Sequence, residues 1–411
     1  MQIRLQLAFL VACSSAAATG AQVVPDATGP GNPLPAGNLS YSVRYMQTAE
    51  FGGYLGDWQT SALSGAVDYS NGKQRFPFSM EYGGGYNWTI AGPSYYTGFF
   101  HHLTLSQGFN WRKWNLTLGD NVSYSPQVPT FGITGIPGIG EPNPGPTPAP
   151  PTNESILSLN THVVDNTANG DISRSLSHAL TIAFGGSSDL FRFPGGDGIN
   201  STTTTGHSGI KWRMNGRNSL TSSYLHSQFS YPDQNISFQT DTGYVGFERA
   251  WSRKLTSSAS AGPQWTTGSV SSLVPSSLGI AINATLTYTF AYSSAGIEYS
   301  RGVNNGAGYL IGGDTDMVSA IYSRRFGQQT TLGFDASYLR TSGLQGTGTT
   351  NARYGGVEAT RRLSRYLVVF ANYSAIDQSS SSALPGNALG QLYQVVGFGF
   401  GYSPRQERHT R

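Results

Sequence analysis

The feature that most constrains the fold is a strict alternation of bulky apolar residues with small or polar ones. In the clearest segment, residues 278–290, Leu, Ile, Ala, Tyr and Phe occupy every second position, with Gly, Ala, Asn and Thr between them. Successive side chains of a β-strand point to opposite faces, so such a strand has one apolar face and one small, wettable face. Repeated along most of the chain, the pattern predicts a transmembrane β-barrel with lipid outside and water inside.

The composition argues against other classes of protein. Charged residues make up 11% of the chain, against about 25% in a typical soluble domain. No apolar run reaches the roughly 18–20 residues that a membrane-spanning helix needs. The net charge of +3 is small and the basic residues do not gather in one patch, so we expect no nucleic-acid partner. No change in composition divides the chain, and we expect one all-β domain over residues 38–402.

The N-terminus has the pattern of an export signal. Arg4 precedes a short apolar stretch over residues 5–12, and small residues follow up to Ala21. This predicts a signal peptide over residues 1–21 and a flexible periplasmic lead-in over residues 22–37. A competing interpretation takes residues 10–13 as a lipoprotein cleavage box, which would leave Cys13 as a lipidated N-terminus. With cleavage after Ala21 the mature chain has no cysteine, which excludes disulfides and thiol chemistry.

Short basic turns alternate with longer polar connections along the chain. Arg174, Arg213 and Arg253 follow one another at intervals of 39 and 40 residues, which fits two strands, one short turn and one longer loop. In outer-membrane barrels the short turns face the periplasm and the longer loops face outward. Counting hairpins predicts an antiparallel up-and-down barrel of about 18 strands, with 16 as the nearest alternative.

Three local features complete the expected organisation. The first strands are expected at 39–46, 61–69 and 75–88, with Phe51 and Trp58 in the loop between the first two. Asn71 and Gly72 predict a tight hairpin turn, because both residues tolerate positive φ angles. Residues 126–160 are rich in proline, which cannot donate to a strand ladder, and we expect a long extracellular loop there. That loop either folds toward the pore or stays disordered outside it.

The last strand carries the sharpest local signal. Val396, Phe398, Phe400 and Tyr402 alternate with three glycines. This segment resembles the C-terminal strand of bacterial outer-membrane β-barrel proteins, which ends in an aromatic residue. The resemblance implies a porin-like protein in the outer membrane of a Gram-negative bacterium, whose last strand is recognised by the barrel-assembly machinery. A polar tail over residues 403–411 departs from that family, whose chains usually end on the aromatic residue.

The tryptophans provide an independent indication of a membrane. An indole has an apolar body and one N–H donor, so it favours the depth of the lipid headgroups. Six tryptophans fall near the ends of expected strands, which predicts membrane-interface positions for them. They are Trp88, Trp111, Trp114, Trp212, Trp251 and Trp265.

Strand parity places a few carboxylates on the inner face. Apolar neighbours at alternate positions predict that Glu81, Glu298 and Asp335 point inward. Charges inside a wide pore set its ion preference. The alternative is that these carboxylates pair with neighbouring arginines and hold the wall together. Asp314 and Asp316 share one face, where they would either bind a hard cation such as calcium or simply be solvated.

The sequence contains no motif for catalysis or for a cofactor. His101 and His102 point to opposite faces of a strand, so they cannot readily share a metal ion. There is no nucleophile elbow, phosphate loop or zinc motif, and serine is too frequent for any pairing with histidine to be informative. We therefore expect no enzyme activity, no cofactor and no metal site.

A barrel of 16–18 strands leaves a lumen wide enough for water unless a segment plugs it. We expect a passive, porin-like channel for small hydrophilic solutes or ions, in contact with outer-membrane lipid and open to homo-oligomer formation. One alternative is a non-conducting surface barrel whose extracellular loops serve adhesion or recognition. Two others are an outer-membrane barrel lipase or protease and a soluble secreted β-sandwich.

Overall fold

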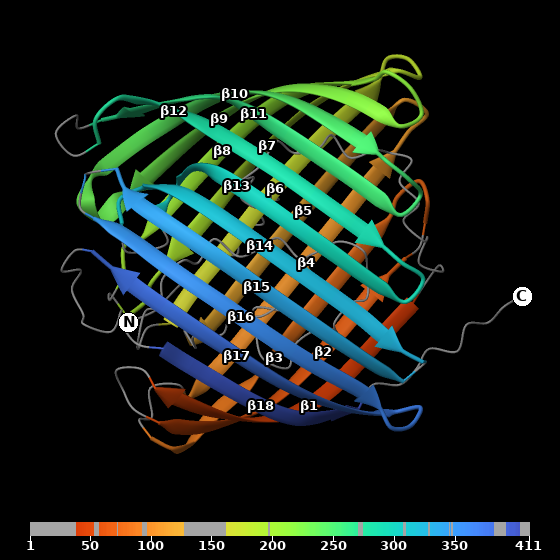
Figure 1. The fold of residues 1–411 in the computed structure, drawn as a ribbon, viewed down its shortest axis with the longest axis vertical. Coiled ribbons are helices and arrows are strands. Elements are labelled where there is room, and N and C mark those ends of the chain that lie inside the picture. The colour runs from red at the N-terminus through yellow and green to blue at the C-terminus, as the bar shows by residue number, and fades with distance from the viewer. Residues whose placement is uncertain are drawn as a thin grey trace, which may run out of the picture.

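The strands of the protein close into a single barrel. A computed structural model contains one antiparallel sheet of 18 strands, in which each strand pairs with its neighbours in the chain and β1 also pairs with β18 (Figure 1). The expectation of an up-and-down barrel of about 18 strands is confirmed. The structure describes residues 38–52, 57–71, 73–92, 97–126, 162–195, 198–269, 274–306, 310–327, 329–344, 346, 348–381 and 392–402.

The strands are 11 to 15 residues long, enough for a tilted strand to cross the hydrocarbon core, which takes about 9–11 residues. One 3₁₀-helix, Pro232–Gln234, lies between β9 and β10. The strands are β1 Asn38–Gly52, β2 Trp58–Ser70, β3 Phe78–Ala91, β4 Gly98–Asn110, β5 Trp114–Pro126, β6 His162–Ser175, β7 Leu180–Arg192, β8 Ser201–Arg213, β9 Asn218–Tyr231, β10 Ile236–Ala250, β11 Leu255–Gly268, β12 Ser277–Thr289, β13 Ser293–Asn304, β14 Gly313–Phe326, β15 Thr330–Gly343, β16 Thr349–Arg362, β17 Leu367–Ser380 and β18 Leu392–Tyr402.

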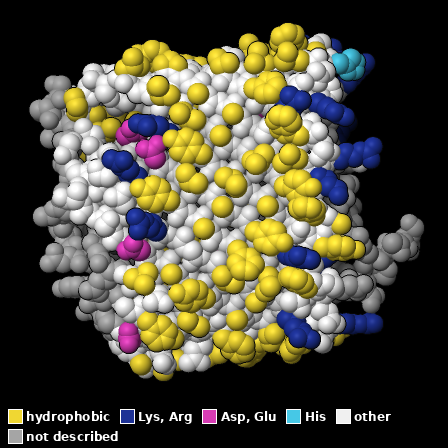
Figure 2. All heavy atoms as spheres, viewed as in Figure 1, with side chains coloured by type: hydrophobic (Ala, Val, Ile, Leu, Met, Phe, Trp, Pro, Cys, Tyr) yellow, Lys and Arg dark blue, Asp and Glu magenta, His cyan; other side chains and the backbone are white. Residues whose placement is uncertain are grey.

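The outer face of the barrel is apolar. In β12, the side chains of Leu278 and Ile280 are 66% and 59% exposed, whereas Ala281 on the opposite face is fully buried. Paired residues of antiparallel strands share a face, so the register extends this assignment around the barrel. Large apolar side chains spread over the middle of the outer surface (Figure 2). Lipid is the solvent that suits such a surface.

The barrel closes where β18 meets β1 and β17. Phe398 and Phe400 of β18 point outward, and the glycines that alternate with them face inward against the neighbouring strands. A Cβ atom at Gly399 would lie 2.4 Å from both the Phe370 ring and the Tyr45 carbonyl oxygen. Glycine therefore occupies this position because the Phe370 ring fills the space in front of it.

The prediction that Phe51 and Trp58 lie in a loop is wrong. Phe51 belongs to β1, and Trp58 is the first residue of β2. The Trp58 side chain is only 4% exposed and packs against Ile376, Tyr393 and Val395 on the inner face. Contacts with strands that are distant in the sequence thus keep Trp58 in a strand, although the alternation of apolar and polar residues is weak around it.

The prediction of a tight turn at Asn71 is also wrong. The connection between β2 and β3 runs over residues 71–77. The Asn71 Oδ1 atom accepts hydrogen bonds from the backbone N–H groups of Lys73 and Phe78, at 3.1 and 2.9 Å. Pro77 has no N–H to donate, so the ladder resumes at Phe78 and Arg75 lies outside the strand.

The expected signal peptide 1–21, the lead-in 22–37, the tail 403–411 and the expected loop 126–160, apart from Pro126 at the end of β5, lie outside the described residues. Within the residues that are described, no helix has the length and hydrophobicity needed to cross a membrane.

The close packing at Gly399 can be tested by substitution. We expect Gly399→Ala to destabilise the folded barrel by roughly 1–3 kcal/mol, the usual penalty for overpacking a filled site. The measurement is the midpoint of unfolding in urea, with heat-dependent mobility in detergent gels as the readout of the folded fraction. Gly355→Ala is the matched control, because no atom lies within 4 Å of a Cβ placed there. Equal midpoints for the two variants would contradict the assigned packing.

Candidate functional site

The inner wall is built largely from small polar side chains that bond to one another across strands. Thr315 of β14 and Thr341 of β15 lie 3.1 Å apart at their hydroxyls, and the Asn304 side chain donates to Thr315 at 2.9 Å. Ser258 and Thr285 form a similar contact of 2.7 Å between β11 and β12. Such cross-strand pairs stabilise a sheet. They also leave a wall that water can wet.

The register places all three candidate carboxylates on this inner face. Glu81 lies opposite Asp68, Glu298 opposite Thr285, and Asp335 opposite Gly356. Asp335 accepts a hydrogen bond from Tyr354. Among the described residues, no Lys or Arg forms an ion pair with Glu81, Glu298 or Asp335.

One inward-facing ion pair and one inward-facing histidine–carboxylate contact were not anticipated from the sequence. The Lys211 ammonium lies 2.7 Å from Glu248, with β9 between their strands, and His207 lies 2.8 Å from Asp171. Both partners of the first pair are largely buried. The position of Lys211 between Ile210 and Trp212, which point outward, could have revealed its direction. Its partner could not be found, because pairing across two strands depends on the register.

Apolar clusters occupy the inner face at the end of the barrel that carries the longer connections. The largest brings the described parts of four connections onto β9 and β10. The Tyr231 hydroxyl donates to the Asn305 carbonyl at 2.9 Å, which holds the connection after β13 against β9. The members are Phe229, Tyr231, Ile236, Phe238 and Val274, with Ile199, Val303, Ile311 and Leu344 packed against them.

Two further clusters lie at the same end, one around Trp58 and one formed by Val163, Phe191 and Phe193. We call the three clusters together the apolar rim. Sequence reasoning missed the rim, although aromatic residues at inward positions of β9 and β10 were a visible signal for it. The described residues of the connections that contribute to it pack against the inner face of the strands.

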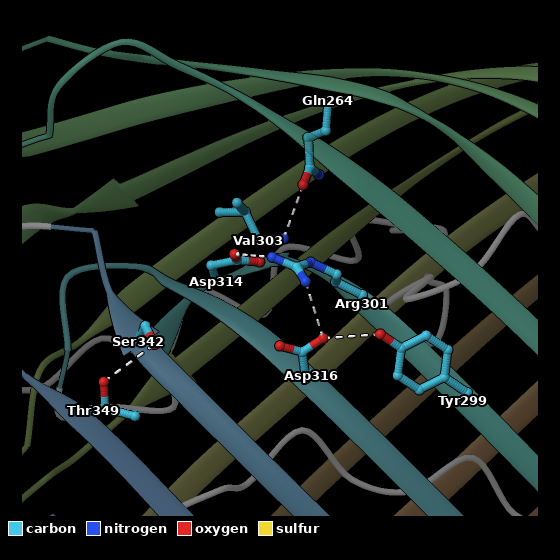
Figure 3. A network of polar contacts seen from close by, with 8 residues as sticks. All are labelled: Gln264, Tyr299, Arg301, Val303, Asp314, Asp316, Ser342 and Thr349. Atoms are coloured by element: carbon cyan, nitrogen blue, oxygen red, sulfur yellow. Dashed lines mark hydrogen bonds and ion pairs between the residues drawn. The ribbon is translucent and has the colours of Figure 1, made fainter.

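Asp314 and Asp316 lie on the outer wall, where they bind Arg301 (Figure 3). The Arg301 guanidinium lies 3.2 Å from Asp314 and 3.6 Å from Asp316. The Tyr299 hydroxyl also donates to Asp316, at 2.9 Å. The Arg301 guanidinium therefore binds the two carboxylates for which the sequence suggested either a hard cation or solvent as the partner. In the described part of the chain, no three Asp, Glu, His or Cys side chains are grouped for metal binding.

The six tryptophans divide between the two ends of the barrel. Trp88 and Trp265 lie toward the end with the longer connections, and the other four lie at or beside the short turns. Arg174 stacks over the Trp114 ring at 4.9 Å and Arg249 over the Trp251 ring at 4.0 Å. All except Trp88 are more than a third exposed. A soluble protein would more often bury these rings.

Comparison with known proteins yields similarity of fold only. No protein-family model and no curated protein matches the chain. Among solved structures it is similar to OccK2 (OpdF) of Pseudomonas aeruginosa, with a TM-score of 0.49, 12% identity, and coverage of 89% of this chain and 98% of that one. For OccK5 (OpdH) of the same organism the values are 0.46, 10%, 90% and 99%. For OccAB4 of Acinetobacter baumannii they are 0.44, 10%, 91% and 99%.

The structure itself assigns the class of protein. A closed, even-numbered antiparallel barrel with an apolar outer band and a polar inner wall is the architecture of outer-membrane proteins. Each of these elements is present in the described residues. The chain is an outer-membrane β-barrel.

The pair of Lys211 and Glu248 provides a test of the inner wall. We expect Lys211→Met to destabilise the barrel by roughly 3 kcal/mol, because a largely buried carboxylate loses its counter-charge. The double variant Lys211→Met, Glu248→Gln should recover part of this loss, since it no longer leaves a charge unpaired. Urea unfolding of both variants measures the difference. A double variant less stable than the single one would contradict the pairing.

Proposed function

We propose that the barrel is a passive, porin-like channel for small hydrophilic solutes or ions. One observation carries the proposal: the same strands that present large apolar side chains to lipid present Thr, Ser, Asn and Gly to the interior. Barrels of 16–18 strands are wide enough to enclose an aqueous channel. An interior whose hydroxyl groups bond within the wall can carry water without offering a tight binding site.

The inner wall supports transport better than catalysis. His102 contacts the Thr104 hydroxyl at 3.0 Å, and His207 contacts Asp171. Within the part of the chain that the structure describes, neither imidazole has both a hydroxyl and a carboxylate as partners. A hydrolase of this kind needs a nucleophile within hydrogen-bond reach of a base that a third group orients. We infer that the protein acts as a conduit and not as a lipase or protease.

The proposal assigns roles to the remaining parts of the wall. The six tryptophans would lie at headgroup depth in contact with outer-membrane lipid, because their rings are accessible at both ends of the barrel. The strand with Val396, Phe398, Phe400 and Tyr402 would be the segment offered to the barrel-assembly machinery. The apolar rim would limit the size of solutes that reach the polar wall below it.

Conductance of the purified full-length chain in planar bilayers tests the channel. We expect discrete conductance steps, together with swelling of liposomes in neutral sugars that falls as the sugar becomes larger. Heat-dependent mobility must first show that the same sample is folded. A folded sample without conductance steps or swelling would contradict the proposal and favour a surface-recognition barrel.

The rim makes a separate prediction. Phe238 packs within the rim, and a Cβ at Gly312 would lie 2.7 Å from its ring. We expect Phe238→Ala to raise the single-channel conductance, because removal of the ring loosens a cluster that lies over the inner face. Phe334→Ala, on the outer wall of β15, is the control and should leave conductance unchanged. Equal conductance in both variants would show that the rim does not limit flow.

A further inference from the structure

Charges of opposite sign are distributed differently over the two faces of the wall. Along the strands, acidic residues outnumber basic ones on the inner face, and the reverse holds on the outer face. The inward acidic residues are Glu50, Asp68, Glu81, Asp165, Asp171, Asp189, Glu248, Glu298, Asp335 and Glu358, and the inward basic residues are Arg44, Lys211, Arg213, Arg325 and Arg362.

Most of the inward basic residues have little influence on the middle of the lumen. Arg213, Arg325 and Arg362 lie at or next to the last residue of their strands, at the short-turn end. Lys211 is matched by Glu248 at 2.7 Å. Arg44 is the inward basic residue that lies nearest the middle of a described strand. The wall between the two ends is therefore acidic.

Other arginines point away from the lumen. Arg301, Arg340 and Arg353 lie on the outer wall, on strands β13, β15 and β16. Arg301 binds Asp314 and Asp316, and Arg353 lies 3.6 Å from Asp377. Arg301 and Arg353 are thus matched by carboxylates on their own face, and all three guanidinium groups lie on the side of the wall away from the lumen, so they do not offset the acidic inner wall.

The connections at the two ends of the barrel differ in charge as well. Among the described residues of the connections at the end with the longer connections there is no Lys or Arg, and the acidic residues are Asp57 and Asp233. Lys and Arg gather instead at the opposite end, where they line one edge of the surface in Figure 2. Since short turns face the periplasm in outer-membrane barrels, the outer entrance is acidic and the inner exit is basic.

We propose that the lumen selects for cations, so that small cationic and neutral hydrophilic solutes pass and small anions are disfavoured. This rests on the proposed channel function. Carboxylates on a low-dielectric wall focus a negative potential of several kT into the lumen, which raises the local concentration of cations. The Debye length is about 10 Å at 0.1 M salt, so the preference is strongest in dilute salt.

Glu298 and Asp335 are the residues best placed to set the preference. Both lie near the middle of their strands, β13 and β15, where a passing ion is farthest from the bulk solution at the two ends. Neither has a Lys or Arg ion-pair partner among the described residues. Their inward neighbours across the strands include Thr285, Ser319 and Gly356, which carry no charge.

Reversal potentials in a KCl gradient test the proposal on the full-length chain in planar bilayers. We expect the wild-type protein to be more permeable to K⁺ than to Cl⁻, and more so in dilute salt. The double variant Glu298→Gln, Asp335→Asn should shift the reversal potential toward zero. The matched control is Asp241→Asn, Asp377→Asn, which removes two carboxylates from the outer wall and should leave the reversal potential unchanged.

The possible outcomes separate this inference from the channel itself. Conductance with no preference, or with a preference for Cl⁻, would overturn the selectivity while the channel stands. Equal shifts in both double variants would show that net charge, and not the inner wall, sets the potential. An absence of conductance in a sample shown to be folded would overturn the channel and the selectivity together.

Discussion

The whole structure depends on closure of the backbone hydrogen-bond ladder. A peptide group left unpaired in hydrocarbon is expensive, so strands can cross a membrane only when every edge is paired. Pairing of β1 with β18 removes the last edge. That contact is possible because glycines of β18 admit the side chains of β17 and the backbone of β1 at close range. The glycine-rich strand β18 thus allows the hydrogen-bond ladder to run without a break through all eighteen strands.

Once the wall is closed, a single layer of strands separates lipid from the interior of the barrel. Each strand contributes alternate residues to lipid and to the interior, so one substitution acts on one face only. The arginines of β13, β15 and β16 illustrate the point, because they lie on the outer wall while Glu298 and Asp335 of the same region point inward. The charge of the lumen is therefore independent of the charge of the chain, whose net value is +3.

Much of this architecture could be predicted from the sequence because it is local. Strand number, turn positions and the direction of a side chain follow from a period of two and from short basic turns. The errors at Trp58 and Asn71 have a different origin. Trp58 joins a strand because it packs against β17 and β18, and Asn71 caps a longer turn that Pro77 imposes. The apolar rim and the Lys211–Glu248 pair also depend on contacts between segments distant in sequence.

The rim and the acidic wall are coupled by their dielectric properties. Phe229, Tyr231 and Phe238 exclude water from part of the inner face at the outer end. Fewer polarisable water molecules there mean weaker screening of any charge nearby. Carboxylates that stay ionised below the rim therefore produce a stronger electrostatic field in the lumen than they would in an open, fully hydrated pore.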